Sequence, residues 1–260
     1  MTEDRPEIVP TTALVTGAAT RIGRAIALAL ARDGWAVAVH YRRSESEARD
    51  VVARVCREGG KAEPFRADLA GEAEALALLP QVRERLGTVG CLINNASEFE
   101  RDEIGDMTRA SWDTHLETNL RAPAVLMQAM ARQLPAGRNG AIVNLLDQRV
   151  LNPTPHFVSY TVSKAALWTL TRTMAMALAP RIRVNAIGPG PTLPSKRQSQ
   201  ADFDRQIGRL PLRCAGTPRD IAAAIRFILA MPSMTGQMIA LDGGQHLGWA
   251  QPREAGGDRE

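Results

Sequence analysis

The amino-acid sequence predicts an α/β fold in which a parallel sheet is covered by helices on both faces, a three-layer αβα arrangement. Short apolar runs alternate along the chain with longer segments of helical periodicity, and this alternation is typical of parallel strands joined by helices. The runs are rich in Val, Ile and Leu on successive residues, as strands buried on both faces should be. Apolar residues form 45% of the 260 residues, enough for a large core.

Seven strands and six helices are expected from these patterns. The strands are expected at 12–15, 36–40, 62–66, 91–93, 141–145, 183–187 and 238–241. The helices are expected at 22–33, 45–58, 72–86, 109–133, 157–179 and 218–230. Glycines stand just past three of these helices, at Gly34, Gly59-Gly60 and Gly87, where a helix C-cap favours glycine.

Residues 1–250 are expected to form one domain, because the alternation contains no linker, internal repeat or low-complexity tract. Residues 251–260 are polar with two glycines and are expected to form a disordered tail. The irregular stretch 189–197 interrupts the alternation, as functional loops commonly do. The conformation of residues 194–210 does not follow from the sequence.

Composition and patterning argue against several classes of protein. The apolar runs fall short of the ~18 residues of a membrane span, and the charged segment 1–10 is unlike a signal peptide. The 32 basic residues are spread along the chain, which indicates a solvated surface rather than a nucleic-acid interface. Cys56, Cys91 and Cys214 are far apart, so we expect no metal site, and free thiols in a reducing cytoplasm.

A glycine turn follows the first strand directly, where residues 16–23 read Thr-Gly-Ala-Ala-Thr-Arg-Ile-Gly and open a helix. Such a turn presents backbone N–H groups and the positive helix end to a pyrophosphate. Gly17 permits the tight turn and Gly23 permits close packing of helix on strand, while Arg21 and Ile22 are expected to border the same ligand. The alternative is an ordinary strand-to-helix turn, since many of these need a glycine.

The second strand ends in a basic segment, Tyr41-Arg42-Arg43-Ser44. In dinucleotide-binding folds an acid at this position accepts the 2′-hydroxyl of NAD, whereas arginines suit the 2′-phosphate of NADP. Guanidinium groups bind phosphate oxygens in a bidentate manner, and this segment contains no acid. The sequence therefore predicts NADPH as the cofactor. The alternative is an exposed basic turn without a ligand.

Two further segments follow buried strands and are expected to line the cofactor. Asp68 and Leu69 follow the third strand, where an adenine amino group would be met. Asn95, Ala96 and Ser97 follow the fourth strand, and they either line the cofactor or form a simple turn.

Tyr160 and Lys164 are the main candidates for acid–base chemistry. Four residues apart on a helix, they share a face, and a neighbouring ammonium is expected to lower the pKa of the phenol toward neutrality. Asp147 lies just past a buried strand, so its carboxylate is expected to face the same crevice. Asn119, in the helix after the fourth strand, is a further polar candidate. The alternative for Tyr160 and Lys164 is a surface pair without a catalytic role. The alternative for Asn119 is an amide within the helix whose hydrogen bonds are satisfied by its neighbours.

Four motifs, Thr-Gly-x-x-x-x-x-Gly, Asn-Asn-Ala, Tyr-x-x-x-Lys and Pro-Gly, together resemble the short-chain dehydrogenase/reductase family over about residues 12–244. The resemblance implies a Rossmann-type, doubly wound sheet in a single domain, a nicotinamide cofactor and a homotetramer. It implies that Tyr160 is the proton donor, that Lys164 holds the nicotinamide ribose and that Asn119 supports a proton relay. The residues expected beside the nicotinamide are Pro189, Gly190 and Thr192.

Two departures from the family pattern resemble its pteridine reductase branch, which includes reductases of dihydromonapterin and dihydrobiopterin. Arg21 stands where the family usually has glycine, and Asp147 stands where it usually has serine. The branch implies that Arg21 reaches phosphate and pterin, that Phe99 stacks on the pterin ring, and that Ser97 hydrogen-bonds nearby. Asp147 would assist Tyr160 in delivering a proton. The alternative for Phe99 is an apolar residue of the pocket wall.

The sequence thus predicts NADPH-dependent reduction of a dihydropterin or folate-like ring, with Tyr160 as proton donor. One competing hypothesis is a carbonyl reductase, such as a 3-oxoacyl-thioester reductase, against which Asp147 argues. Another is a catalytically silent NADP-binding regulator, against which Tyr160, Lys164 and Asn119 argue. The natural pterin and the physiological pathway do not follow from the sequence.

Overall fold

The computed structural model describes residues 11–195 and 197–248. Its strands are β1 (Thr12–Val15), β2 (Ala36–Tyr41), β3 (Ala62–Arg66), β4 (Val89–Asn94), β5 (Gly140–Leu145), β6 (Ile182–Pro189) and β7 (Met238–Leu241). They form one sheet in the order β3-β2-β1-β4-β5-β6-β7, and all neighbours run parallel. The chain winds from β1 to one edge, returns to β4 and winds to the other edge, which confirms the predicted doubly wound sheet.

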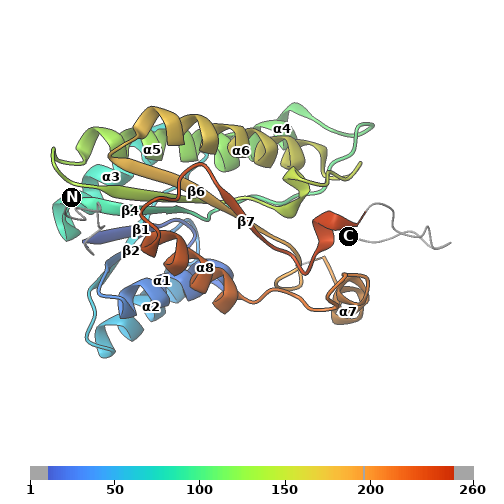
Figure 1. Cartoon of the computed structure of the whole chain (residues 1–260), viewed down its shortest axis with the longest axis horizontal. Coiled ribbons are helices and arrows are strands. Elements are labelled where there is room, and N and C mark those ends of the chain that lie inside the picture. The colour runs from blue at the N-terminus through green and yellow to red at the C-terminus, as the bar shows by residue number, and fades with distance from the viewer. Residues whose placement is uncertain (1–10, 196, 249–260) are drawn as a thin grey trace.

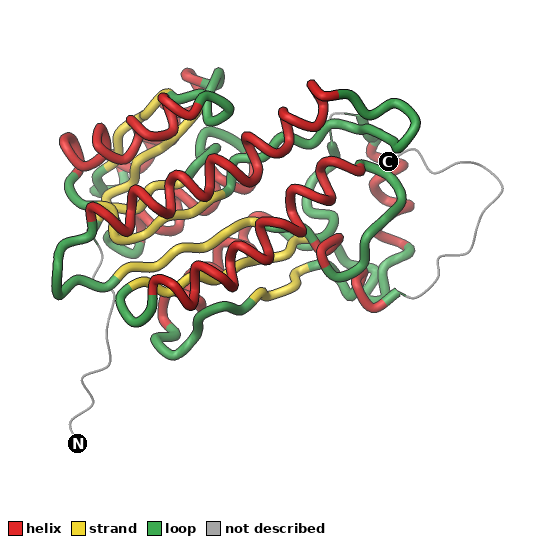
Figure 2. The backbone as a smooth tube through the Cα atoms, turned by 90° about the horizontal axis from the view of Figure 1, so that it is seen from above, coloured by secondary structure: helices red, strands yellow, loops and turns green. Residues whose placement is uncertain are grey.

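Helices cover both faces of this sheet. They are α1 (Arg21–Arg32), α2 (Glu45–Arg57), α3 (Glu72–Leu86), α4 (Arg109–Leu116), α5 (Ala122–Gln133), α6 (Val158–Leu178), α7 (Gln200–Gly208) and α8 (Pro218–Ala230). Figure 1 shows α1, α2 and α8 on one side of the sheet and α3, α4, α5 and α6 on the other. Seen from above, helices lie over the strands and run in roughly the same direction as they do (Figure 2). The three-layer αβα prediction is therefore confirmed.

Successive strand residues pack into two different cores, one on each face of the sheet. Leu14 and Leu92 belong to the core on the side of α3 and α5, whereas Val15 and Ile93 belong to the core on the side of α1 and α8. All four side chains are fully buried. Burial on both faces explains why these strands are continuous apolar runs rather than alternating ones.

The predicted elements are all present, with ends that differ from the prediction by one or two residues for most of them. Gly34, Gly59 and Gly87 have φ values of +88°, +85° and +95°, so the predicted glycine C-caps are confirmed. The predicted helix 109–133 is interrupted, because a π-helical turn at Glu117–Arg121 joins α4 to α5. Such turns are common at functional sites.

Helix α7 was not predicted, and it lies in the stretch 194–210 whose conformation did not follow from the sequence. Its start is a capping box: the Ser199 side chain accepts a hydrogen bond from the Asp202 N–H, and the Asp202 side chain accepts one from the Ser199 N–H. The Ser-x-x-Asp spacing is typical of a helix start and could have predicted where α7 begins.

Two findings concern the described residues only. No described helix is both long and apolar enough to cross a membrane. No group of described His, Cys, Asp and Glu side chains has the geometry to hold a metal ion. The predicted tail, 251–260, lies outside the described residues.

Candidate active site

The glycine turn after β1 is tightly packed. Gly17 has a φ of +62°, and a Cβ at this position would lie 3.2 Å from Ala96 Cα. A Cβ at Gly23 would lie 2.1 Å from Gly17 O, so only glycine fits there. The Asn95 amide Nδ2 donates to Thr16 O at 2.7 Å and to Gly17 O at 3.2 Å. Both predicted glycines are therefore sterically required, and Asn95 fastens the turn to the end of β4.

His40 also fastens this turn, a role that the sequence analysis missed. The Gly17 N–H donates to His40 Nδ1 at 3.0 Å, and His40 Nε2 lies 3.1 Å from Ala67 O. Because Nδ1 accepts, Nε2 carries the proton and donates to Ala67, so the imidazole is neutral. Burial lowers its pKa from 6.5 to about 4, which keeps it neutral at physiological pH.

Two cavities meet beside the turn. The first, here called the turn cavity, is lined by Gly17, Thr20, Arg21, Ile22, Gly23, His40, Arg42, Ala67, Asp68, Leu69, Asn95, Ala96, Ser97, Glu98 and Thr118. The second, here called the tyrosine cavity, is lined on one side by Arg21, Ile22, Asn95 and Ser97 and on the other by Asp147, Tyr160 and Lys164. Four residues line both cavities, so the two form a continuous site at the carboxyl ends of the strands.

The structure brings most predicted cofactor residues to the turn cavity, but not all of them. Arg42 lines it, whereas Arg43 is exposed and Ser44 lies at the N-cap of α2. The Tyr41 side chain is buried in the apolar core under α1. Tyr41 and Arg42 differ in this way because neighbouring residues at the end of β2 point to opposite faces of the sheet.

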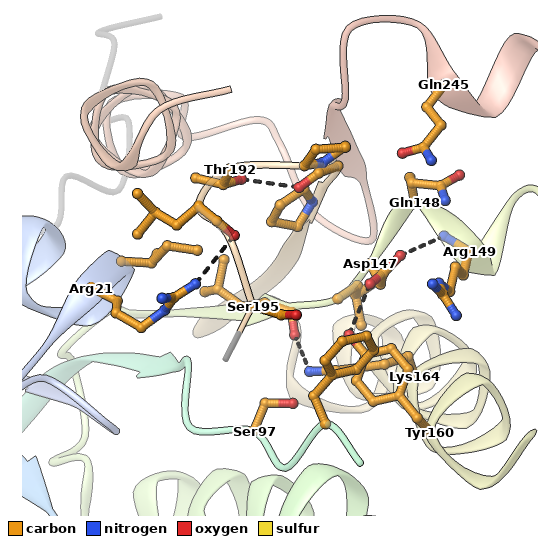
Figure 3. Close-up of a pocket in the computed structure, with 18 of the residues that line it drawn as sticks. Arg21, Ser97, Asp147, Gln148, Arg149, Tyr160, Lys164, Thr192, Ser195 and Gln245 are labelled. Atoms are coloured by element: carbon orange, nitrogen blue, oxygen red, sulfur yellow. Dashed lines mark hydrogen bonds between the residues drawn. The ribbon is translucent and has the colours of Figure 1, made fainter. Parts of the chain in front are cut away.

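In the tyrosine cavity the side chains of Tyr160 and Asp147 point toward each other, and Lys164 lies beside them with its ammonium directed at the Leu145 carbonyl (Figure 3). The Tyr160 hydroxyl donates to Asp147 Oδ2 at 2.8 Å, and Asp147 Oδ1 accepts from the Arg149 backbone N–H at 2.8 Å. Lys164 Nζ donates to Leu145 O at 2.8 Å and lies 5.8 Å from the centroid of the Tyr160 ring. The predicted acid–base cluster is therefore assembled, and its tyrosine and lysine are buried.

The predicted direction of the Tyr160 pKa is wrong for this structure. Burial raises the pKa of the phenol well above 10, and the Asp147 carboxylate raises it further by repulsion and by accepting its hydrogen bond. The ammonium of Lys164 is directed at Leu145 O, and burial lowers its own pKa to about 8. Tyr160 is therefore a protonated phenol at neutral pH, the form that can donate a proton.

Asn119 lies on the π-helical turn and is fully buried. Its Oδ1 accepts from the Glu98 N–H at 2.8 Å, and its Nδ2 donates to Glu98 O at 3.0 Å and to Ser163 Oγ at 3.1 Å. The side-chain amide thus clamps the segment after β4 to helix α6. These contacts support the cavity wall, whereas the predicted proton relay stays a prediction.

Phe99 lines the tyrosine cavity, as predicted, and has an aromatic partner that the sequence analysis missed. Its ring stacks on Phe157 with centroids 4.5 Å apart and planes 3° apart, and it meets the Tyr160 ring edge-on at 4.6 Å and 72°. Phe157 is fully buried and has a φ of +57°. The aromatic wall therefore consists of Phe99 and its buried support, packed directly against the phenol.

A buried polar chain beneath Tyr160 was also missed. Glu100 N–H donates to His115 Nε2 at 3.0 Å, so His115 Nδ1 carries the proton that it donates to Ser159 Oγ at 2.6 Å. Ser159 Oγ in turn donates to the Asp102 carboxylate. Asp102, His115 and Ser159 are all buried, and none of them lines either cavity. This trio anchors the start of α6, next to Tyr160.

The segment after β6 closes the tyrosine cavity on its other side. Arg21 Nη2 donates to Leu193 O at 3.3 Å and to Pro194 O at 3.0 Å, across the cavity from Asp147 (Figure 3). Arg197 donates to Phe99 O at 2.6 Å and pairs with the Glu100 carboxylate at 2.5 Å. The residues predicted beside the nicotinamide also line this cavity: Pro189, Gly190 and Thr192.

The fold and the site together define a class of protein. It is a doubly wound domain with a glycine turn after β1 and a buried tyrosine–lysine pair at the carboxyl ends of the strands. The family model described as enoyl-(acyl carrier protein) reductase matches residues 17–246. The chain therefore belongs to this family, within the short-chain dehydrogenase/reductases, and the predicted family is confirmed.

Similar proteins narrow the comparison. FolM alternative dihydrofolate reductase 1 from Brucella suis, solved in complex with NADP, is 48% identical with a TM-score of 0.91, over 93% of this chain and 97% of that chain. The Brucella canis protein, also complexed with NADP, is 47% identical with a TM-score of 0.91, over 97% of this chain and 100% of that chain. The 3-oxoacyl-(acyl-carrier-protein) reductase FabG of Staphylococcus epidermidis is 33% identical over 240 residues, 90% of this chain and 98% of that protein.

Proposed function

We propose that this chain is an NADPH-dependent reductase of a dihydropterin or dihydrofolate-like ring. The observation that carries the proposal is the hydrogen bond from the Tyr160 hydroxyl to Asp147, in a cavity also lined by Arg21 and Phe99. A flat heteroaromatic ring suits an aromatic wall, and a ring C=N group needs a proton donor at nitrogen. The similarity to NADP-bound dihydrofolate reductases supports the same conclusion.

The turn cavity fits the phosphates of a dinucleotide. The φ of +62° at Gly17 and the absence of room for a Cβ at Gly23 bring backbone N–H groups and the start of α1 close to a ligand. Arg21 and Arg42 add two cations to the lining, and a guanidinium such as that of Arg42 can bind a 2′-phosphate in a bidentate manner. Lys164, Pro189 and Gly190 line the adjoining tyrosine cavity, where the nicotinamide would lie.

The reduced nicotinamide supplies the hydride when it is bound. Tyr160 holds the proton at its phenol oxygen, because burial and Asp147 raise its pKa. Asp147 accepts the phenol hydrogen bond and orients the phenol oxygen, which becomes a phenolate when its proton is delivered. Lys164 is fixed by Leu145 O and supplies positive charge that stabilises this phenolate. One hydride at carbon and one proton at nitrogen balance the reduction.

The test is direct. Purified protein is mixed with NADPH and dihydrobiopterin or dihydromonapterin, and the loss of NADPH absorbance is followed. Turnover of the pterin supports the proposal. Absence of pterin turnover together with turnover of an acetoacetyl thioester supports the second candidate function, carbonyl reduction, which the identity with FabG favours. Tight NADP⁺ binding without turnover of any of these substrates supports a silent regulator.

We further infer from the family resemblance that the protein is a homotetramer in the cytoplasm. The three cysteines are free in the structure, in keeping with a reducing compartment. Light scattering on the purified protein tests the tetramer.

A further inference from the structure

Arg42 lies between two carboxylates at the turn cavity. Its Nη1 is 2.5 Å from Glu98 Oε1 and 4.0 Å from Asp68 Oδ1. All three side chains line this cavity, whereas Arg43 is exposed and does not. The guanidinium best placed for a 2′-phosphate is therefore already paired with an acid, and this acid comes from the segment after β4 rather than from the end of β2.

The backbone of Glu98 is held in place independently of its side chain. The Asn119 amide binds both its N–H and its C=O, at 2.8 Å and 3.0 Å. Asn119 is fully buried, whereas the Glu98 side chain is 21% exposed. The carboxylate can therefore leave Arg42 by rotating its own side chain, without moving Ser97 and Phe99 on either side of it.

We infer that Glu98 sets the preference of this site for the 2′-phosphate, an inference that rests on the proposed NADPH cofactor. A carboxylate and a phosphate compete for the same guanidinium N–H groups, and two anions at this spacing repel each other. An acid near the ribose can instead accept the 2′-hydroxyl of NAD. Glu98 thus weakens the binding of NADP and leaves the binding of NAD in place. The ratio of the two affinities is therefore smaller than it would be without this carboxylate.

The experiment measures the Kd values of NADP⁺ and NAD⁺ by isothermal titration for the full chain and for Glu98→Gln, which keeps the size of the side chain. Glu98→Gln is expected to bind NADP⁺ about twofold to fivefold more tightly and NAD⁺ no more tightly than the natural protein. Glu103→Gln is the matched control. It removes one negative charge from the same loop, but Glu103 pairs with Arg101 and His156 and lines neither cavity, so neither Kd should change.

A second measurement uses Arg42→Gln in both backgrounds. Arg42→Gln should weaken NADP⁺ binding more in the Glu98→Gln background, where Arg42 no longer pairs with Glu98, than in the natural one. Equal losses in the two backgrounds overturn the inference. So does weaker NADP⁺ binding by Glu98→Gln, or an equal effect on the two cofactors. If the natural protein binds neither cofactor, the proposed function fails with it, whereas NADP⁺ binding with an unchanged preference rejects only the role of Glu98.

Discussion

The hydroxyl of Tyr160 is hydrogen-bonded to the carboxylate of Asp147 at 2.8 Å, and both groups line one cavity. The contact joins helix α6 to the end of β5, two elements that are adjacent in space because β5 pairs with β6 and α6 connects them.

Removing the phenol oxygen of Tyr160 while keeping its ring should separate the chemical role of the side chain from its packing. Tyr160→Phe is expected to lower kcat about 10²- to 10⁴-fold, with an unchanged circular dichroism spectrum and NADP⁺ affinity. An unchanged kcat would show that Tyr160 is not the proton donor.

The pH profile should report on Lys164. Burial lowers its pKa to about 8, and the nearby Asp147 carboxylate opposes that shift. The ammonium is present below this pKa and is lost as the pH rises through it, so kcat/KM is expected to fall above about pH 8. Asp147→Asn removes the opposing charge and should move this fall to lower pH. An alkaline limb that stays in place, or moves upward, would contradict the assignment.

Phe157 supports the aromatic wall from inside the protein. Because it is fully buried and stacked on Phe99, Phe157→Ala should lower the free energy of unfolding by about 3–5 kcal/mol and raise the KM for the pterin. Phe227→Ala is the matched control, since that ring is 48% exposed, and should cost about 1 kcal/mol or less. Denaturant titration measures both, and similar losses for the two variants would refute the role of Phe157.

The buried chain of Asp102, Ser159 and His115 should contribute to stability and to the position of Tyr160. Ser159→Ala leaves the Asp102 carboxylate and the His115 N–H each without this partner, which should cost about 1–3 kcal/mol. It should also lower kcat, because Ser159 precedes Tyr160 in α6. The exposed Ser46→Ala, on α2, should leave both quantities unchanged. A Ser159→Ala protein with natural stability would exclude an anchoring role.

His40 should make the fold sensitive to acid. The folded protein keeps it neutral down to a pKa of about 4, whereas the unfolded chain takes up the proton near 6.5. The unfolded state therefore binds more protons in this window, and stability should fall by roughly 3 kcal/mol as the pH drops from 6.5 to 4. His40→Gln should remove this contribution to the pH dependence, and His156→Gln, at an exposed histidine, should retain it. Identical slopes in both variants would argue against the neutral His40.

Much of the fold and of the site could be predicted because their signals are local. The apolar runs of the strands, the glycines at Gly17 and Gly23, and the four-residue spacing of Tyr160 and Lys164 each depend on a few neighbouring residues. Order along the chain then implied which ends of the strands would meet, so Asp147 could be placed at the same edge of the sheet. Helix α7 had a local signal as well, in Ser199 and Asp202, that was not used.

Other properties depend on residues far apart in the chain. The pairing of Arg42 with Glu98, the stacking of Phe99 on Phe157 and the clamp formed by Asn119 appear only when the strands are assembled. The same holds for the pKa of Tyr160: sequence spacing shows that an ammonium is near, but the shift is a balance of burial and charge over the whole cavity. Spacing along a helix determines which groups meet, whereas desolvation, which the surrounding elements impose together, decides which protonation state they hold.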